Sequence, residues 1–176
     1  EASANDILDY TLSVGTTTSF VYTTSYKQST EALFHAALAK DMRLVAGKIL
    51  MDQNALPELQ DTAASGYQDS VDLINEWHGK GRLGYAVTPR FSGTSSVEQL
   101  TLAGQLLKEF PDVWMQTHMS ENLEEIRWLK TVHPHTADYP AWSVAFPAYA
   151  LKSHQPETGQ WFWPCQEIFA VPLYHL

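Results

Sequence analysis

The stretch LINEWHGKGRLGYAVTPRF (residues 73–91) decides the fold class, because the apolar spacing of a helix is followed there by the apolar run of a strand. Its first part completes a helical pattern over residues 60–78, in which apolar side chains recur three positions apart. After a glycine-containing turn, residues 83–88 form an apolar run with the composition of a buried strand. A helix that leads through a short turn into a buried strand is typical of parallel α/β proteins.

The same alternation extends to both sides of this stretch. Hydrophobic spacing predicts strands over 16–22, 43–51, 83–88 and 113–117. It predicts helices over 5–14, 28–40, 60–78, from a capping box at 95–98 to the residue before Pro111, and over 122–130. Alternation of this kind implies parallel strands that are joined by right-handed crossovers.

An open doubly wound sheet and a (β/α)₈ barrel both satisfy this pattern. No G-x-G-x-x-G motif follows a predicted strand, which disfavours the open nucleotide-binding sheet. A complete barrel needs about 250 residues, more than the chain provides. We therefore predict an α/β fold that contains about four βα units of a partial (β/α)₈, TIM-like barrel.

The regular pattern ends near residue 138. Residues 139–176 are rich in proline and tryptophan and show no clean periodicity, apart from a strand pattern over 168–171. We therefore predict two parts, a partial barrel over 1–138 and a divergent, irregular tail over 139–176.

Composition narrows the class of protein. The net charge of −9 disfavours nucleic acid as a partner, and no apolar run of about 18 residues predicts a membrane span. Cys165 is the single cysteine, which excludes an internal disulfide and favours a reducing, cytoplasmic compartment. The first residue is Glu1 and no signal peptide follows, so we expect the chain to begin inside a longer protein.

Catalytic groups of parallel barrels lie where the strands end, and the strand over 113–117 ends in chemically capable residues. His118 follows this strand directly, and Glu121 comes three residues later. A neutral imidazole can bind zinc, and a nearby carboxylate can move protons to and from water. The alternative is structural: His118 binds a loop, while Glu121 and Asn122 cap the next helix.

The strand over 83–88 ends in Arg90 and Phe91 at the same predicted edge. An arginine beside an aromatic ring can hold the polar edge of a flat heterocycle, although a surface ion pair is the simpler interpretation. Asp52 ends the strand over 43–51 and either binds a ligand or caps a helix. We reject His133-Pro134-His135 as a metal site because it follows a helix and not a strand.

Three segments together resemble the guanine deaminases, which belong to the metal-dependent amidohydrolases. The segments are LVAGKILMDQNA (44–55), LINEWHGKGRLGYAVTPRFSGTSSVEQL (73–100) and PDVWMQTHMSEN (111–122), which match in order and spacing. The likeness covers residues 10–138, and TPRF followed by QTHMSEN is more specific than either motif alone. The resemblance implies a barrel with one zinc ion that hydrolyses guanine to xanthine and ammonia, a step of purine catabolism.

The resemblance also implies roles for four residues. His118 is a zinc ligand, Glu121 shuttles protons, Arg90 holds the purine carbonyl, and Phe91 lines the base pocket. The chemistry agrees, because zinc lowers the pKa of its water towards about 7 and ammonia needs a proton to leave. The complete protein is then expected to be a homodimer that binds guanine.

Other zinc ligands of the family fall outside the matched segments. The resemblance places a His-x-His pair before Glu1 and an aspartate beyond Leu176. The family has a further histidine after Phe-Ala, whereas Phe169-Ala170 is followed here by Val171. We therefore expect an incomplete zinc site in this chain alone.

Two other functions stay open. The first is an amidohydrolase that acts on another heterocycle, such as a triazine or a pterin, although Arg90-Phe91 beside the His118 motif favours a purine. The second is a truncated form without catalysis that acts as an interaction partner of the complete enzyme. Open strand edges and apolar faces of a half-barrel favour such pairing.

Overall fold

The computed structural model describes residues 2–119, 121–134 and 167–170. Helices and strands alternate along these residues. In chain order they are α1 (Ala2–Ser13), β1 (Thr18–Tyr22), α2 (Lys27–Ala39), β2 (Arg43–Gly47), β3 (Ile49–Leu50), the 3₁₀ turn η1 (Pro57–Leu59), α3 (Ala63–Trp77), β4 (Leu83–Pro89), α4 (Val97–Glu109), β5 (Trp114–His118), α5 (Leu123–Val132) and β6 (Glu167–Ala170).

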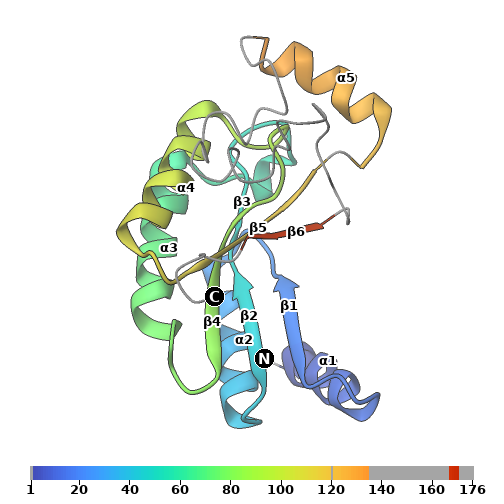
Figure 1. The fold of residues 1–176 in the computed structure, drawn as a ribbon, viewed down its shortest axis with the longest axis vertical. Helices are drawn as coiled ribbons and strands as arrows, with labels where there is room; N and C mark the ends of the chain where they lie inside the picture. The colour runs from blue at the N-terminus through green and yellow to red at the C-terminus, as the bar shows by residue number, and fades with distance from the viewer. Residues whose placement is uncertain (1, 120, 135–166, 171–176) are drawn as a thin grey trace, which may run out of the picture.

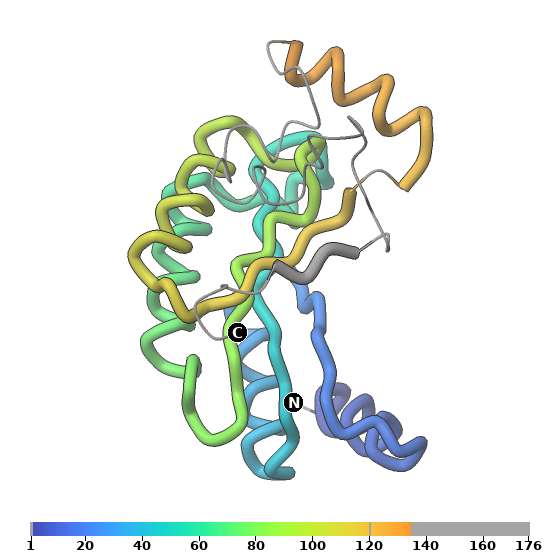
Figure 2. The backbone as a smooth tube through the Cα atoms, viewed as in Figure 1, coloured from blue at the N-terminus to red at the C-terminus, as the bar shows by residue number. Residues whose placement is uncertain are grey.

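The strands form one curved sheet in the order β1-β2-β4-β5-β6, with β3 paired to β4. The pairs β1–β2, β2–β4 and β4–β5 are parallel, which confirms the predicted partial barrel. Helices α2, α3 and α4 lie together along one side of the sheet (Figure 1). Figure 2 shows that α5 stands apart from them, beyond the end of β5.

One strand pairs differently from the parallel core. β6 runs antiparallel to β5, with Gln116 opposite Phe169 and His118 opposite Glu167. The predicted strand over 168–171 is therefore present, one residue earlier than expected. The proposed boundary near residue 138 falls outside the described residues and stays a prediction.

The strand predicted over 43–51 is interrupted at Lys48, which separates β2 from β3. The Lys48 side chain is buried and forms an ion pair with Asp61. On either side of this break, β2 and β3 both pair with β4.

The core lies between the sheet and the helices. Phe34 of α2 stacks on Trp77 of α3 at 5.6 Å between ring centroids, and both side chains are fully buried. Tyr85 of β4 completes this layer and donates its hydroxyl to Ser70 at 3.2 Å. Burial raises the pKa of Tyr85 to about 12, so its hydroxyl stays protonated.

The start of α4 differs from the prediction by one residue. Ser96, rather than Ser95, is the N-cap, and its side chain accepts a hydrogen bond from Gln99 N at 3.1 Å. Ser95 is instead buried in the preceding loop, where its hydroxyl donates to Leu50 O. Within the described part of the chain, none of the helices combines the length and apolar character needed to cross a membrane.

Candidate active site

The carbonyl oxygen of Arg90 joins the ends of β4 and β5. It accepts hydrogen bonds from His118 N at 2.9 Å and from Thr117 Oγ1 at 3.3 Å. The Arg90 amide in turn donates to Leu50 O at 3.2 Å, at the end of β3. Adjacent parallel strands therefore present Arg90 and His118 at the same rim of the sheet, as the sequence predicted.

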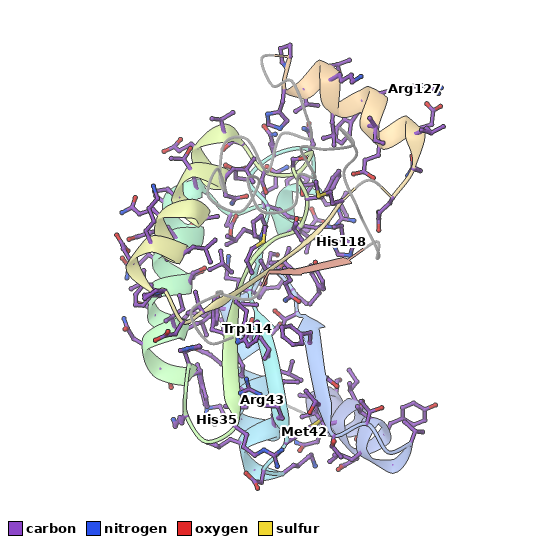
Figure 3. All side chains as sticks on the ribbon, viewed as in Figure 1. His35, Met42, Arg43, Trp114, His118 and Arg127 are labelled. Carbon is purple, nitrogen blue, oxygen red and sulfur yellow. The ribbon has the colours of Figure 1, made fainter. Side chains whose placement is uncertain are left out.

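The His118 ring is held by a further contact to this carbonyl. Its Nδ1 lies 3.1 Å from Arg90 O, and because a carbonyl can only accept, Nδ1 carries the proton and donates. In a neutral ring of this tautomer the lone pair is on Nε2, the nitrogen that could bind a metal. Tyr22 of β1 packs against this ring at 4.3 Å between centroids, and Figure 3 shows His118 at the end of β5.

Arg90 and Phe91 form a second wall of the site. The Arg90 guanidinium lies over the Phe91 ring, 5.3 Å from its centroid, and Phe91 packs on Trp128 of α5 at 6.0 Å. Gly93 makes this packing possible, because a Cβ at that position would lie 2.2 Å from Trp128 and 2.6 Å from Phe91. A flat aromatic wall beside a cation suits a planar heterocycle.

Glu121 lies immediately before the helix cap rather than in it. Asn122 is the N-cap of α5, and its side chain accepts from Glu125 N at 2.9 Å. The Glu121 amide donates to the Glu125 carboxylate at 2.8 Å, while the Glu121 side chain is exposed. The capping role that the sequence left open therefore belongs to Asn122.

All four predicted site residues line one pocket of about 470 Å³. Arg90 also lines a second pocket of about 630 Å³, on the side of the loops that follow β1 and β3. The first pocket is completed by α5 residues that the sequence analysis missed, of which Trp128 is the largest. The strand-end rule could have found Tyr22, which ends β1, but it holds no signal for Trp128.

The other sequence candidates have structural roles here. Asp52 accepts from Ser96 N at 2.7 Å, so it holds the start of α4, which is the capping alternative. His133 is buried, and its Nε2 bonds Ser92 O at 2.8 Å, in keeping with its rejection as a metal ligand. His135 and Cys165 lie outside the described residues.

The metal site cannot be built from the described residues. Among them no three His, Cys, Asp or Glu side chains gather in a way that could hold a metal ion. A catalytic zinc has three protein ligands, of which this part of the chain offers His118. The tautomer of His118 is suitable for a metal ligand. The described residues, however, supply too few ligands to hold a metal ion.

Residues 4–141 match the model of the amidohydrolase family. The chain belongs to the amidohydrolase family. Curated relatives of the chain are named guanine deaminase, and the guanine deaminases of this family are metal-dependent enzymes. The predicted family is therefore confirmed.

Similar proteins extend this result. This amidohydrolase chain is 50% identical to the guanine deaminase of Escherichia coli over 78% of the chain and 30% of the relative. The solved structure of an E. coli guanine deaminase matches with a TM-score of 0.76 over 85% of the chain and 35% of that structure. A guanine deaminase from C. acetobutylicum, solved with guanine in its active site, is 26% identical with a TM-score of 0.75, over 86% of this chain and 35% of that one.

A more distant likeness concerns the fold alone. A triazine hydrolase from Arthobacter aurescens has a TM-score of 0.68 at 17% identity, over 81% of this chain and 34% of that one. The chain spans about 30% of the length of the curated guanine deaminases that it matches.

Proposed function

We propose that the complete protein hydrolyses guanine to xanthine and ammonia, and that this chain supplies one side of its active site. The observation that carries the proposal is the convergence of Arg90, Phe91, His118 and Glu121 on one pocket. Relatives named guanine deaminase, the first at 50% identity, support a purine over the triazine or pterin alternatives.

Arg90 and Phe91 are proposed to recognise the purine. The guanidinium is a permanent cation with several N–H donors, so it can donate to the carbonyl of guanine. Phe91, supported by Trp128, offers an aromatic surface for the ring. These contacts are equally strong in the bound substrate and in the transition state. They should therefore lower KM and leave kcat nearly unchanged.

Glu121 is proposed to move the protons of the reaction. Water adds to the ring carbon that bears the amine, and the C–N bond to that amine then breaks. Glu121 accepts the first proton that the water loses and delivers it to the ring nitrogen beside that carbon. It then transfers the remaining hydroxyl proton to the amine, so that the ring carbonyl forms as the C–N bond breaks and neutral ammonia leaves. The position of Glu121 in the lining of the pocket and the exposure of its carboxylate support this proposal.

The metal, the partner and the compartment are parts of the same proposal. We expect zinc as the metal, with Nε2 of His118 as one ligand, and a homodimer in the cytoplasm. Zinc, when bound, would activate the attacking water.

The test is a substrate panel on the complete protein that contains this chain. Guanine, a chlorotriazine and a pterin are incubated separately, and loss of absorbance is measured together with released ammonia. Turnover of guanine with ammonia in equal amount supports the proposal. Preference for the triazine or the pterin, or no turnover of the metal-loaded protein, would contradict it.

A further inference from the structure

The segment that follows β3 is bound along the loop that follows β4. We call residues 51–54 the clamp and residues 90–96 the Arg90 loop. The clamp amides of Asp52 and Gln53 both donate to Thr94 O, at 3.0 and 3.3 Å. Two clamp side chains reach further along the loop, because Gln53 Nε2 donates to Ser95 O at 3.1 Å and Asn54 Nδ2 donates to Gly93 O at 2.9 Å.

Asp52 makes the charged contacts of the clamp. Its Oδ1 accepts from the backbone of Ser96 at 2.7 Å, and its Oδ2 accepts from the Ser96 hydroxyl. Ser96 in turn accepts from Gln99 N, so one carboxylate fixes both the end of the Arg90 loop and the first turn of α4. A negative charge at the start of a helix is also favoured by the helix dipole.

The other end of the Arg90 loop is fixed by the strands. Arg90 donates to Leu50 O and accepts from His118, as described for the rim of the sheet. Arg90 itself is exposed on a flexible side chain, so the backbone around it must hold its position. Asp52 is not among the described residues that line either pocket.

We infer that Asp52 is a positioning residue for substrate recognition, which acts through the Arg90 loop and does not touch the substrate. This inference rests on the proposed function. The clamp holds the loop that carries Arg90, which lines both pockets, and Phe91, which lines the first, so losing it should weaken the binding that Arg90 provides. The prediction is therefore energetic coupling between Asp52 and Arg90.

Guanine kinetics of the complete, metal-loaded protein test this coupling. Asp52→Ala should lower kcat/KM by about tenfold, mainly through KM, which is the scale of a lost hydrogen bond to a charged group. Asp52→Asn retains an oxygen acceptor for Ser96 N and should stay within about threefold of the original protein. When Arg90→Ala is already present, Asp52→Ala should cost less than about threefold. A full, multiplicative loss in the double variant would overturn the inference.

A matched control separates positioning from general stability. Thr62 caps α3 as Ser96 caps α4, and its side chain accepts from Ser65 N at 3.0 Å. Thr62→Ala should lower Tm to a similar extent while kcat/KM for guanine stays unchanged. An equal rise in KM for Thr62→Ala would show that any lost cap produces the effect, which also overturns the inference.

Hydrogen exchange supplies a readout that does not depend on guanine. In Asp52→Ala the Ser96 amide should exchange faster, whereas the Ser65 amide should not change. If the original protein does not deaminate guanine, the proposed function fails while exchange still reports on the clamp. If Asp52→Ala does not fold, Ser96→Ala replaces it, because it removes the hydroxyl that donates to Asp52 Oδ2. Absence of coupling between Ser96→Ala and Arg90→Ala would equally overturn the inference.

Discussion

At the scale of single residues, the N-cap of α5 and the proposed proton shuttle are adjacent but different residues, Asn122 and Glu121. Asn122 satisfies the first turn of α5, so Glu121 can be changed without removing that cap. In the complete protein Glu121→Gln should lower kcat by about 100-fold or more, the usual scale for lost acid–base catalysis. Steady-state kinetics and metal analysis check this, with the exposed Glu76→Gln as a control. Near-normal turnover with metal retained would refute the proton-shuttle role.

Lys48 gives a second prediction at this scale. It is buried, pairs with Asp61, and lies 3.7 Å from Asp69. Burial raises the pKa of the Asp61 carboxyl, while the contacts with Lys48 and Gln99 lower it. Lys48→Met leaves this carboxylate without its cation and should cost about 3 kcal/mol or more of unfolding free energy.

Urea unfolding measures this loss, and two further variants interpret it. Lys48→Met with Asp61→Asn should recover much of the stability, because no uncompensated charge stays buried. Lys40→Met removes the more exposed pair with Asp9 and should cost less than about 1 kcal/mol. Equal losses for Lys40→Met and Lys48→Met would contradict this account.

The sequence located the proposed site residues because parallel strands end at a common edge. Arg90 and His118 follow separate strands, and their meeting requires only that rule. The contact between Phe91 and Trp128 could not be derived in this way, since it depends on how α5 packs. Gly93 leaves space for the two rings, but the sequence alone does not show why glycine is needed there, because the two rings are its neighbours only in the folded structure.

At the scale of elements, the turn between α3 and β4 should respond to pH. His78 ends α3, and its Nδ1 accepts a hydrogen bond from Tyr85 N at 3.0 Å. Burial lowers the pKa of the His78 imidazole from its usual value, helped by Arg43 and opposed by Asp112. A protonated Nδ1 cannot accept, so the folded protein favours the neutral ring.

The sign of the pH effect follows from linkage. Because the folded pKa of His78 lies below the unfolded value of 6.5, acid protonates the unfolded chain first. The contribution of His78 to stability is therefore present above that value and is lost as the pH falls through the folded pKa. His78→Asn keeps an acceptor that does not titrate, so its unfolding free energy should fall less between pH 7.5 and 5.5. Urea curves at both pH values check this, and identical pH dependence would contradict it.

The order and type of the elements could be predicted because apolar spacing differs between helices and strands. The break at Lys48 could not, because residues 43–51 are apolar on both sides of it. The partners of the Lys48 side chain, Asp61 in the loop before α3 and Asp69 in α3, lie in parts of the chain on which the spacing of residues 43–51 carries no information. Likewise, Ser95 and Ser96 are equivalent as caps until Asp52 selects Ser96.

At the scale of the whole molecule, the donor set predicts weak zinc binding by the 176-residue chain. His118 is the ligand that the described residues supply at the rim, and tight catalytic sites need three. Equilibrium dialysis followed by elemental analysis should find well below one zinc per chain, with little change in His118→Ala. One tightly held zinc would show that residues outside the described ranges complete the site.

β6 occupies the edge of β5 to which the next strand of a continuous barrel would pair. β6 runs antiparallel along the side of β5 that faces away from β4. In a continuous (β/α)₈ barrel that same side accepts a parallel strand. Two strands cannot use the same row of backbone donors and acceptors, so the two pairings compete as two ligands compete for one receptor. Which pairing prevails depends on their difference in free energy, and anything that binds only one of them shifts the balance.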